Sequence, residues 1–142
     1  MIVPKVAEKY LDIIYEKHGR DPATGLDCWG LLILFFKQEF GIDLPAYDFL
    51  YADEAEISEA LALTRGDDAP WVEVEEKDLR FGDVVLFFSL RDVLHVGVVL
   101  DQVHFLHCNI YTEYACIERL DSASWRNRRI GFFRYKELMN RD

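Results

Sequence analysis

One cysteine and two distant histidines have the residue types and surroundings that nucleophilic catalysis needs. Cys28 follows Asp27, and three residues after it begins the apolar run 31–36, which is typical of a buried helix. Backbone N–H groups and the positive end of the dipole at a helix N-terminus favour a thiolate. His95 and His107 lie downstream, twelve residues apart, and could supply a base and its orienting partner. The pattern predicts a cysteine nucleophile served by histidine.

This chemistry requires a helix that begins at the cysteine. Asp27 is a common N-cap residue, and Gly41 is a common residue just after a helix end, so we expect a helix between them. The segment is apolar almost all round, which predicts a buried central helix. Apolar residues at three- and four-residue steps predict an amphipathic helix over residues 3–16. The acidic residues 54–63 predict a third, exposed helix.

The histidines belong to a second half in which the pattern changes to short strand-like runs. We expect five strands, at residues 83–88, 94–100, 103–108, 113–120 and 130–135. Helices followed by strands indicate an α+β fold, with one antiparallel sheet of about five strands packed on the central helix. The length of 142 residues, without repeats or a linker, predicts a single domain over residues 1–142.

The turn between the two histidine-bearing strands decides whether the histidines can meet. A two-residue turn at residues 101–102 would place His95 opposite Cys108. His107 would then point to the other face, because side chains alternate along a strand. A three-residue loop at residues 100–102 would instead pair His95 with His107 on one face. The catalytic hypothesis needs this odd loop or a bulge, and the sequence is compatible with either arrangement.

Composition excludes several classes of partner. The net charge of −10 disfavours nucleic acid, because phosphates repel such a surface. No apolar run approaches the roughly 20 residues that span a bilayer, so no membrane insertion is expected. The N-terminal residues lack the apolar core and cleavage site of a signal peptide, which predicts synthesis in the cytoplasm without one. Three cysteines without a framework spacing predict reduced thiols.

A metal centre is the competing interpretation of the same residues. Cys28, His95, His107 and Cys108 are all metal-ligand types. They include no Cys-x-x-Cys or His-x-x-x-His pair, and the neighbouring His107 and Cys108 should point to opposite faces of a strand. We therefore predict no metal and no cofactor.

Several motifs resemble, in the same order, those of the NlpC family of cell-wall peptidases. They are Asp-Cys-Trp-Gly-Leu at residues 27–31, Phe-Gly-Asp-Val-Val-Leu-Phe at 81–87, His-Val-Gly-Val-Val-Leu at 95–100 and Phe-Leu-His at 105–107. The segments at residues 18–22, 40–45 and 130–135 are similar to the phage-tail branch of that family. The resemblance spans nearly the whole chain.

The resemblance implies a papain-like α+β fold and a catalytic triad. By position, Cys28 is the nucleophile, His95 the base and His107 the residue that orients it. Family members hydrolyse peptidoglycan stem peptides, commonly between D-γ-glutamate and a diamino acid. Asp27 matches a position that helps to bind the free amine of the stem peptide, although a helix cap is its other function. Trp29 stands where well-studied members carry Ser; it either lines the substrate cleft or, as we favour, packs in the core.

The phage-tail likeness also sets the alternative function. A tail-assembly component could keep the fold with little or no hydrolytic activity, and tail proteins would then be its partners. The absence of a signal peptide fits delivery to the cell wall by a virion tail. The complete set of Cys28, His95 and His107 favours the enzyme.

Overall fold

The fold positions the cysteine and the histidines on one helix and one sheet. The computed structural model describes residues 5–45, 69–88, 94–109 and 111–139. Along the chain the helix and strands are β1 (Arg20–Asp21), β2 (Gly25–Leu26), α1 (Cys28–Phe40), β3 (Trp71–Val74), β4 (Val84–Phe88), β5 (Leu94–Val99), β6 (His104–His107), β7 (Cys116–Arg119) and β8 (Arg129–Tyr135). Short 3-10 helices lie at Lys5–Tyr10, Glu76–Asp78, Arg126–Arg128 and Lys136–Leu138.

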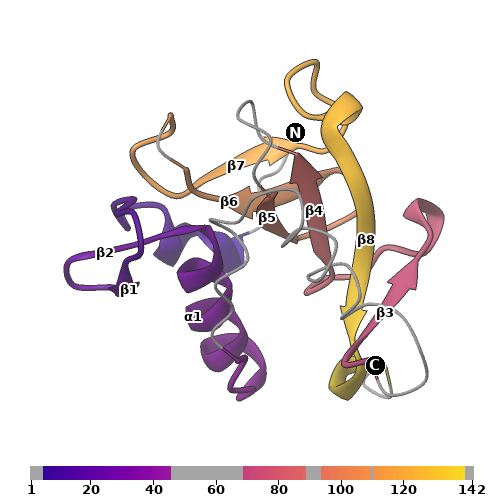
Figure 1. Cartoon of the computed structure of the whole chain (residues 1–142), viewed down its shortest axis with the longest axis horizontal. Coiled ribbons are helices and arrows are strands. Elements are labelled where there is room, and N and C mark those ends of the chain that lie inside the picture. Colours follow the sequence, from indigo (N-terminus) through magenta and orange to yellow (C-terminus); the bar gives the residue numbers. More distant parts are fainter. Residues whose placement is uncertain (1–4, 46–68, 89–93, 110, 140–142) are drawn as a thin grey trace.

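The main sheet has six strands in the order β3-β8-β4-β5-β6-β7, and all neighbours are antiparallel. Helix α1 lies against one side of it, beside β5 (Figure 1). This is the predicted α+β arrangement, and the sheet gains one strand, β3, that the sequence prediction omits. The small pair β1-β2 lies in the breaker-rich segment that precedes α1.

Helix α1 begins and ends where its caps predict. The Asp27 carboxylate accepts a hydrogen bond from the backbone N–H of Gly30 at 2.7 Å, which satisfies one of the unpaired donors of the first turn. Gly41 ends the helix in the left-handed conformation, at φ 68° and ψ 24°. The predicted central helix is confirmed, with its N-terminal half buried.

The N-terminal segment differs from its prediction. In place of an amphipathic helix over residues 3–16, the described part forms a single 3-10 helix, Lys5–Tyr10. Ile14 then makes an antiparallel bridge with Tyr114, and Tyr15 makes a parallel bridge with Leu26. Residues that favour extended backbone, such as Ile and Tyr, therefore join strand partners here, and tertiary pairing overrides the helical period. The helix predicted at residues 54–63 lies outside the described residues.

The two faces of the sheet carry separate hydrophobic clusters. On one face Val96 and Val98 of β5 pack with α1 in a cluster that includes Cys28. On the other face Val99 of β5 and Phe105 of β6 belong to a second cluster. This division follows the alternation of side chains along each strand. Within the described residues, no helix is long and apolar enough to cross a membrane.

Candidate active site

Cys28 is the first residue of α1, and its thiol lies beside strand β5. The sulfur accepts hydrogen bonds from the backbone N–H groups of Val96 and Trp29. Val96 follows His95 in β5, so the start of α1 meets the sheet at the residue next to the predicted base. Among the described residues, no hydrogen bond joins the Cys28 sulfur to the His95 ring. Catalytic hydrogen bonds are often long before substrate binds.

The thiol is less acidic than its helix position predicts. Burial raises the pKa of Cys28 to about 12, and the nearby Asp27 carboxylate adds to the increase. The amides of Val96 and Trp29 and the charge of Arg20 act in the opposite direction, with smaller effect. The expectation of a stabilised thiolate is therefore wrong for the folded protein, because desolvation outweighs the helix N-terminus. A base must remove the proton as the sulfur attacks.

The two predicted histidines are in direct contact. Nε2 of His95 and Nδ1 of His107 are 2.8 Å apart in a buried hydrogen bond. The register differs from both turns considered above: Val98 pairs with Leu106 and Val99 with Phe105, so a longer connection separates the strands. This shift has the same parity as the three-residue loop, and the two histidines therefore share a face.

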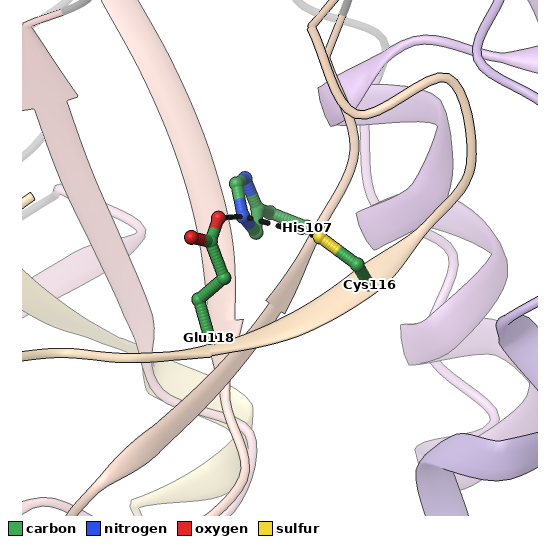
Figure 2. Close-up of side chains that lie close together, drawn as sticks. All are labelled: His107, Cys116 and Glu118. Carbon is green, nitrogen blue, oxygen red and sulfur yellow. Dashed lines mark hydrogen bonds and ion pairs between the residues drawn. The ribbon is translucent and has the colours of Figure 1, made fainter. Parts of the chain in front are cut away.

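The chain of hydrogen bonds continues from His107 to a carboxylate on β7. Nε2 of His107 lies 2.5 Å from Oε2 of Glu118. A dashed line marks this contact in Figure 2. The indole N–H of Trp125 donates to the same oxygen at 3.0 Å. The Trp125 ring also stacks on His95, with centroids 5.2 Å apart, and packs edge-on against His107. These contacts fix both imidazole rings in place.

The electrostatics suit a neutral base beside an ionised carboxylate. Burial, with a smaller contribution from His107, holds the pKa of His95 well below its usual range, so its ring is neutral at pH 7. The hydrogen bond from His107 lowers the pKa of Glu118, although partial burial opposes this. Among the described residues, Nδ1 of His95 has no hydrogen-bond partner. The His95 ring thus has one nitrogen free to accept a proton.

The two residues predicted to contact substrate are enclosed by protein. The Asp27 carboxylate is 1 % exposed; besides its cap to Gly30, its second oxygen lies 3.4 Å from the guanidinium of Arg20. Trp29 is 2 % exposed, donates from its indole to the Pro45 carbonyl at 2.8 Å and packs edge-on against Trp71. These contacts describe a cap and a core residue, and substrate contact by either side chain stays a prediction.

His107 and two of its neighbours form a group of three residues that could hold a metal ion. His107, Cys116 and Glu118 each offer one ligand atom, and these atoms lie within 4.8 Å of one another. Ligand bonds of about 2 Å in a tetrahedral zinc site would separate two ligand atoms by roughly 3.3 Å. The 2.5 Å between His107 and Glu118 is instead a hydrogen-bond distance. The arrangement favours a hydrogen-bonded chain over a metal centre.

Glu118 and Trp125 are the site residues that the sequence prediction omits. Glu118 does fall within a predicted strand, residues 113–120, on the same face as Cys116. The pairing partner of the strand at residues 113–120 depends on the connection after Cys108. The residue pattern does not encode the length and shape of that connection. The observed register pairs His107 with Cys116 and brings Glu118 diagonally next to it.

A comparison with known families agrees with this arrangement. A sequence profile of the NlpC/P60 family matches residues 14–134. The chain belongs to the NlpC/P60 family. The match includes α1, the main sheet apart from the last residue of β8, and all residues of the hydrogen-bonded chain. The predicted family is confirmed.

Two proteins to which the chain is similar carry the names of hydrolases. The chain is 26% identical over 141 residues to a gamma-DL-glutamyl hydrolase of Bacillus subtilis, covering 96% of this chain and 29% of that protein. It is 23% identical over 126 residues to murein DD-endopeptidase MepS/murein LD-carboxypeptidase of Escherichia coli, covering 87% of this chain and 58% of that protein. The chain therefore spans less than two thirds of the length of each of these relatives.

A solved NlpC/P60 structure shares the fold. A lipoprotein-like member from Staphylococcus aureus superposes with a TM-score of 0.64 at 24% identity, over 91% of this chain and 38% of that one. Likeness at this identity shows the architecture alone. The papain-like α+β fold expected from the sequence is thereby confirmed.

Proposed function

We propose that this chain is a cysteine hydrolase that cleaves amide bonds in peptidoglycan stem peptides. Cys28 is the nucleophile, His95 the base and His107 the residue that orients the base. The observation that carries the proposal is the buried hydrogen bond between Nε2 of His95 and Nδ1 of His107, on the strand that meets the start of α1. Membership of the NlpC/P60 family and the hydrolase names of two relatives support the substrate class.

Acylation begins with transfer of a proton from the Cys28 thiol to Nδ1 of His95. The sulfur attacks the amide carbonyl carbon at the same time, because a thiol with a raised pKa is not ionised beforehand. The C–N bond of the resulting tetrahedral adduct then breaks. His95 gives its proton to the departing amine, and a thioester on Cys28 remains.

Deacylation uses the same groups, with water in place of the amine. A water molecule gives a proton to Nδ1 of His95 and attacks the thioester carbonyl. The C–S bond breaks, the proton returns to the Cys28 sulfur, and the product leaves as a carboxylic acid. His107 holds the His95 ring in one orientation through both halves of the reaction.

The bond between D-γ-glutamate and the diamino acid is the substrate bond that we propose. The names of the two relatives refer to different bonds, a γ-glutamyl linkage and DD or LD linkages. A substrate panel should therefore contain a separate muropeptide for each of these bonds.

The test is digestion of purified muropeptides followed by mass spectrometry, with three proteins. Wild type is compared with Cys28→Ala and with the matched control Cys108→Ala, whose thiol is buried and donates to the Leu26 carbonyl. We expect wild type and Cys108→Ala to release the γ-glutamyl product and Cys28→Ala to release none. Equal cleavage by folded Cys28→Ala, or no cleavage by any of the three, would overturn the proposal.

Delivery by a phage tail, and action at the cell wall from that particle, stays a prediction from the sequence. The competing function is a tail-assembly part with the same fold. It predicts no thiol-dependent cleavage of any muropeptide in that digestion, together with binding to tail proteins in a separate pull-down. Cleavage that depends on Cys28 would favour the enzyme.

A further inference from the structure

Glu118 ends a hydrogen-bonded chain whose other end is the proposed base. The chain runs from Glu118 to Nε2 of His107 and from Nδ1 of His107 to Nε2 of His95. All three side chains lie on one face of the sheet, on the neighbouring strands β5, β6 and β7. The His107 side chain is fully buried, whereas 33% of the Glu118 side chain is exposed. The carboxylate therefore sits at the solvent end of the chain.

The donors and acceptors of this chain fit only one proton arrangement when both imidazoles are neutral. An indole N–H can only donate, so Oε2 of Glu118 accepts from Trp125. An ionised carboxylate also accepts from Nε2–H of His107. A neutral imidazole carries one proton, so Nδ1 of His107 must then accept. Its donor is Nε2–H of His95.

This arrangement leaves the lone pair of His95 on Nδ1, the nitrogen without a partner among the described residues. The opposite tautomer of His95 would carry a proton on Nδ1 and could not accept one from a thiol. When Nδ1 does take up a proton, the positive charge is stabilised through His107 by the negative charge of Glu118.

We propose that Glu118 is a positioning residue that sets the protonation pattern of His107 and, through it, the reactive tautomer of His95. Trp125 assists by holding Oε2 of Glu118 and stacking on His95. The catalytic consequence rests on the proposed function, whereas the tautomer assignment does not. Glu118 acts through His107 and does not touch the reacting atoms.

The Cys116 thiol is the other group near Nε2 of His107. Its sulfur lies 3.7 Å away, and burial raises the pKa of this thiol to about 11, so it is neutral at pH 7. A neutral thiol is a weak donor and a weak acceptor, whereas the carboxylate is 2.5 Å from the same nitrogen. The carboxylate therefore decides which atom carries the proton.

The direct test is long-range proton–nitrogen NMR of the protein labelled with 15N-histidine, which distinguishes Nδ1–H from Nε2–H in each ring without any substrate. In wild type, at a pH where each ring carries one proton, we expect that proton on Nε2 of both His95 and His107. In Glu118→Leu, which removes the acceptor, we expect both rings to become tautomer mixtures. Glu118→Gln keeps an acceptor oxygen and should retain much of the wild-type pattern.

The matched control is Asp101→Asn. Asp101 pairs with Nδ1 of His104, another histidine of β6, but has no bond to His95 or His107. This variant should leave both rings of the chain unchanged. Trp125→Phe keeps a ring but loses the indole donor, and it serves as a second test if Glu118→Leu does not fold. We expect the tautomers of His95 and His107 to change in the same direction as in Glu118→Leu, by a smaller amount.

Kinetics supply the second measurement. Loss of the residue that orients a metal-ligating histidine typically costs about 10- to 100-fold. We expect a similar effect for this base, so that kcat of Glu118→Leu falls about 10- to 100-fold with KM little changed. Glu118→Gln should recover a large part of that loss. A mere structural role would lower the folded fraction but leave kcat per folded molecule and the tautomers unchanged.

Two NMR results would overturn the inference. One is a wild-type His95 or His107 whose single ring proton lies on Nδ1. The other is an unchanged tautomer in Glu118→Leu. If wild type cleaves no muropeptide but shows the expected tautomers that depend on Glu118, the proposed function fails and the inference about Glu118 stands.

Discussion

Two buried polar networks in this protein each join a carboxylate to nitrogen-bearing side chains, but they serve different purposes. At one end of the sheet, Nε and Nη2 of Arg134 on β8 each donate to an oxygen of Asp83, both at 2.7 Å. Nη2 also donates to the Asp78 carbonyl, and the Arg80 amide donates to Asp83. This network is closed: each carboxylate oxygen of Asp83 accepts a bond from the guanidinium.

The chain Glu118–His107–His95 is open by comparison. It is equally buried at His95 and His107, but it ends at Nδ1 of His95, which has no partner among the described residues. In the described part of the chain, Nδ1 of His95 is not one of the fully buried side-chain atoms that lack a partner, so this nitrogen is open to solvent and can accept a proton. The difference indicates that the Asp83–Arg134 pair holds strands together, whereas the histidine chain keeps one lone pair available for chemistry.

Breaking the closed pair should have the largest effect. In Asp83→Ala the buried guanidinium of Arg134 loses both charged partners, which for a buried pair typically costs 3–5 kcal/mol, so we expect about 3–5 kcal/mol less free energy of unfolding. Urea denaturation measures it. The control is Asp121→Ala, which removes an exposed ion pair with Arg119 and should change little. Equal stability of Asp83→Ala and wild type would contradict the structural role.

Breaking the open chain in its middle should affect catalysis more than stability. We expect His107→Asn to lower kcat by about 100-fold, roughly 3 kcal/mol of transition-state stabilisation, because His95 loses the group that orients it. Steady-state kinetics on the γ-glutamyl muropeptide measures this. His104→Asn, on the same strand, should keep wild-type kcat. An equal loss in both variants would mean that the strand, and not the chain, is disturbed.

The two networks should also differ in their response to mild acid. Burial lowers the pKa of His95 below its ordinary 6.5, so below that pH the unfolded chain takes up a proton that the folded chain refuses. The free energy of unfolding should therefore fall as pH decreases below about 6.5, by at most about 1.4 kcal/mol per pH unit for one group.

Glu118 adds a contribution at lower pH. Its pKa is lowered in the folded protein, so the stability that it contributes is present above its ordinary 4.5 and is lost as pH falls through the folded value. Urea denaturation from pH 7.5 to about 2.5 follows both steps. His95→Gln should flatten the upper step only, and an unchanged profile in this variant would contradict the assignment.

The cap of α1 offers the smallest and finest test. Asp27→Ala should lose about 1 kcal/mol of stability with the N-cap bond to Gly30. Asp27→Asn keeps an acceptor and should lose much less. If Asp27 also binds the amine of a stem peptide, Asp27→Asn will raise KM while stability is nearly kept. An unchanged KM would limit Asp27 to its cap.

The sequence predicts best those features that depend on neighbouring residues. The ends of α1 follow from Asp27 and Gly41, and the two histidines lie on the strands that the sequence predicts, because alternation and turns are local signals. The predicted helix over residues 3–16 is wrong because Ile14 and Tyr15 find strand partners far along the chain. The three- and four-residue spacing of apolar residues carries no information about strand partners far along the chain.

The site was predicted in part for the same reason. His95 and His107 were recognised from their strands and from motif order, whereas Glu118 depends on the register between β6 and β7. The state of Cys28 was predicted wrongly, since helix position is visible in sequence but the depth of burial that raises its pKa is set by the packed fold.

Trapping of the acyl-enzyme tests the central claim most directly. Wild-type protein is mixed with the γ-glutamyl muropeptide, quenched in acid within the first turnovers and digested for mass spectrometry. We predict an adduct with the mass of the acyl half of the substrate on the peptide that contains Cys28, absent from Cys108 and Cys116. Turnover without an adduct on Cys28, or an adduct on another cysteine, would contradict the account.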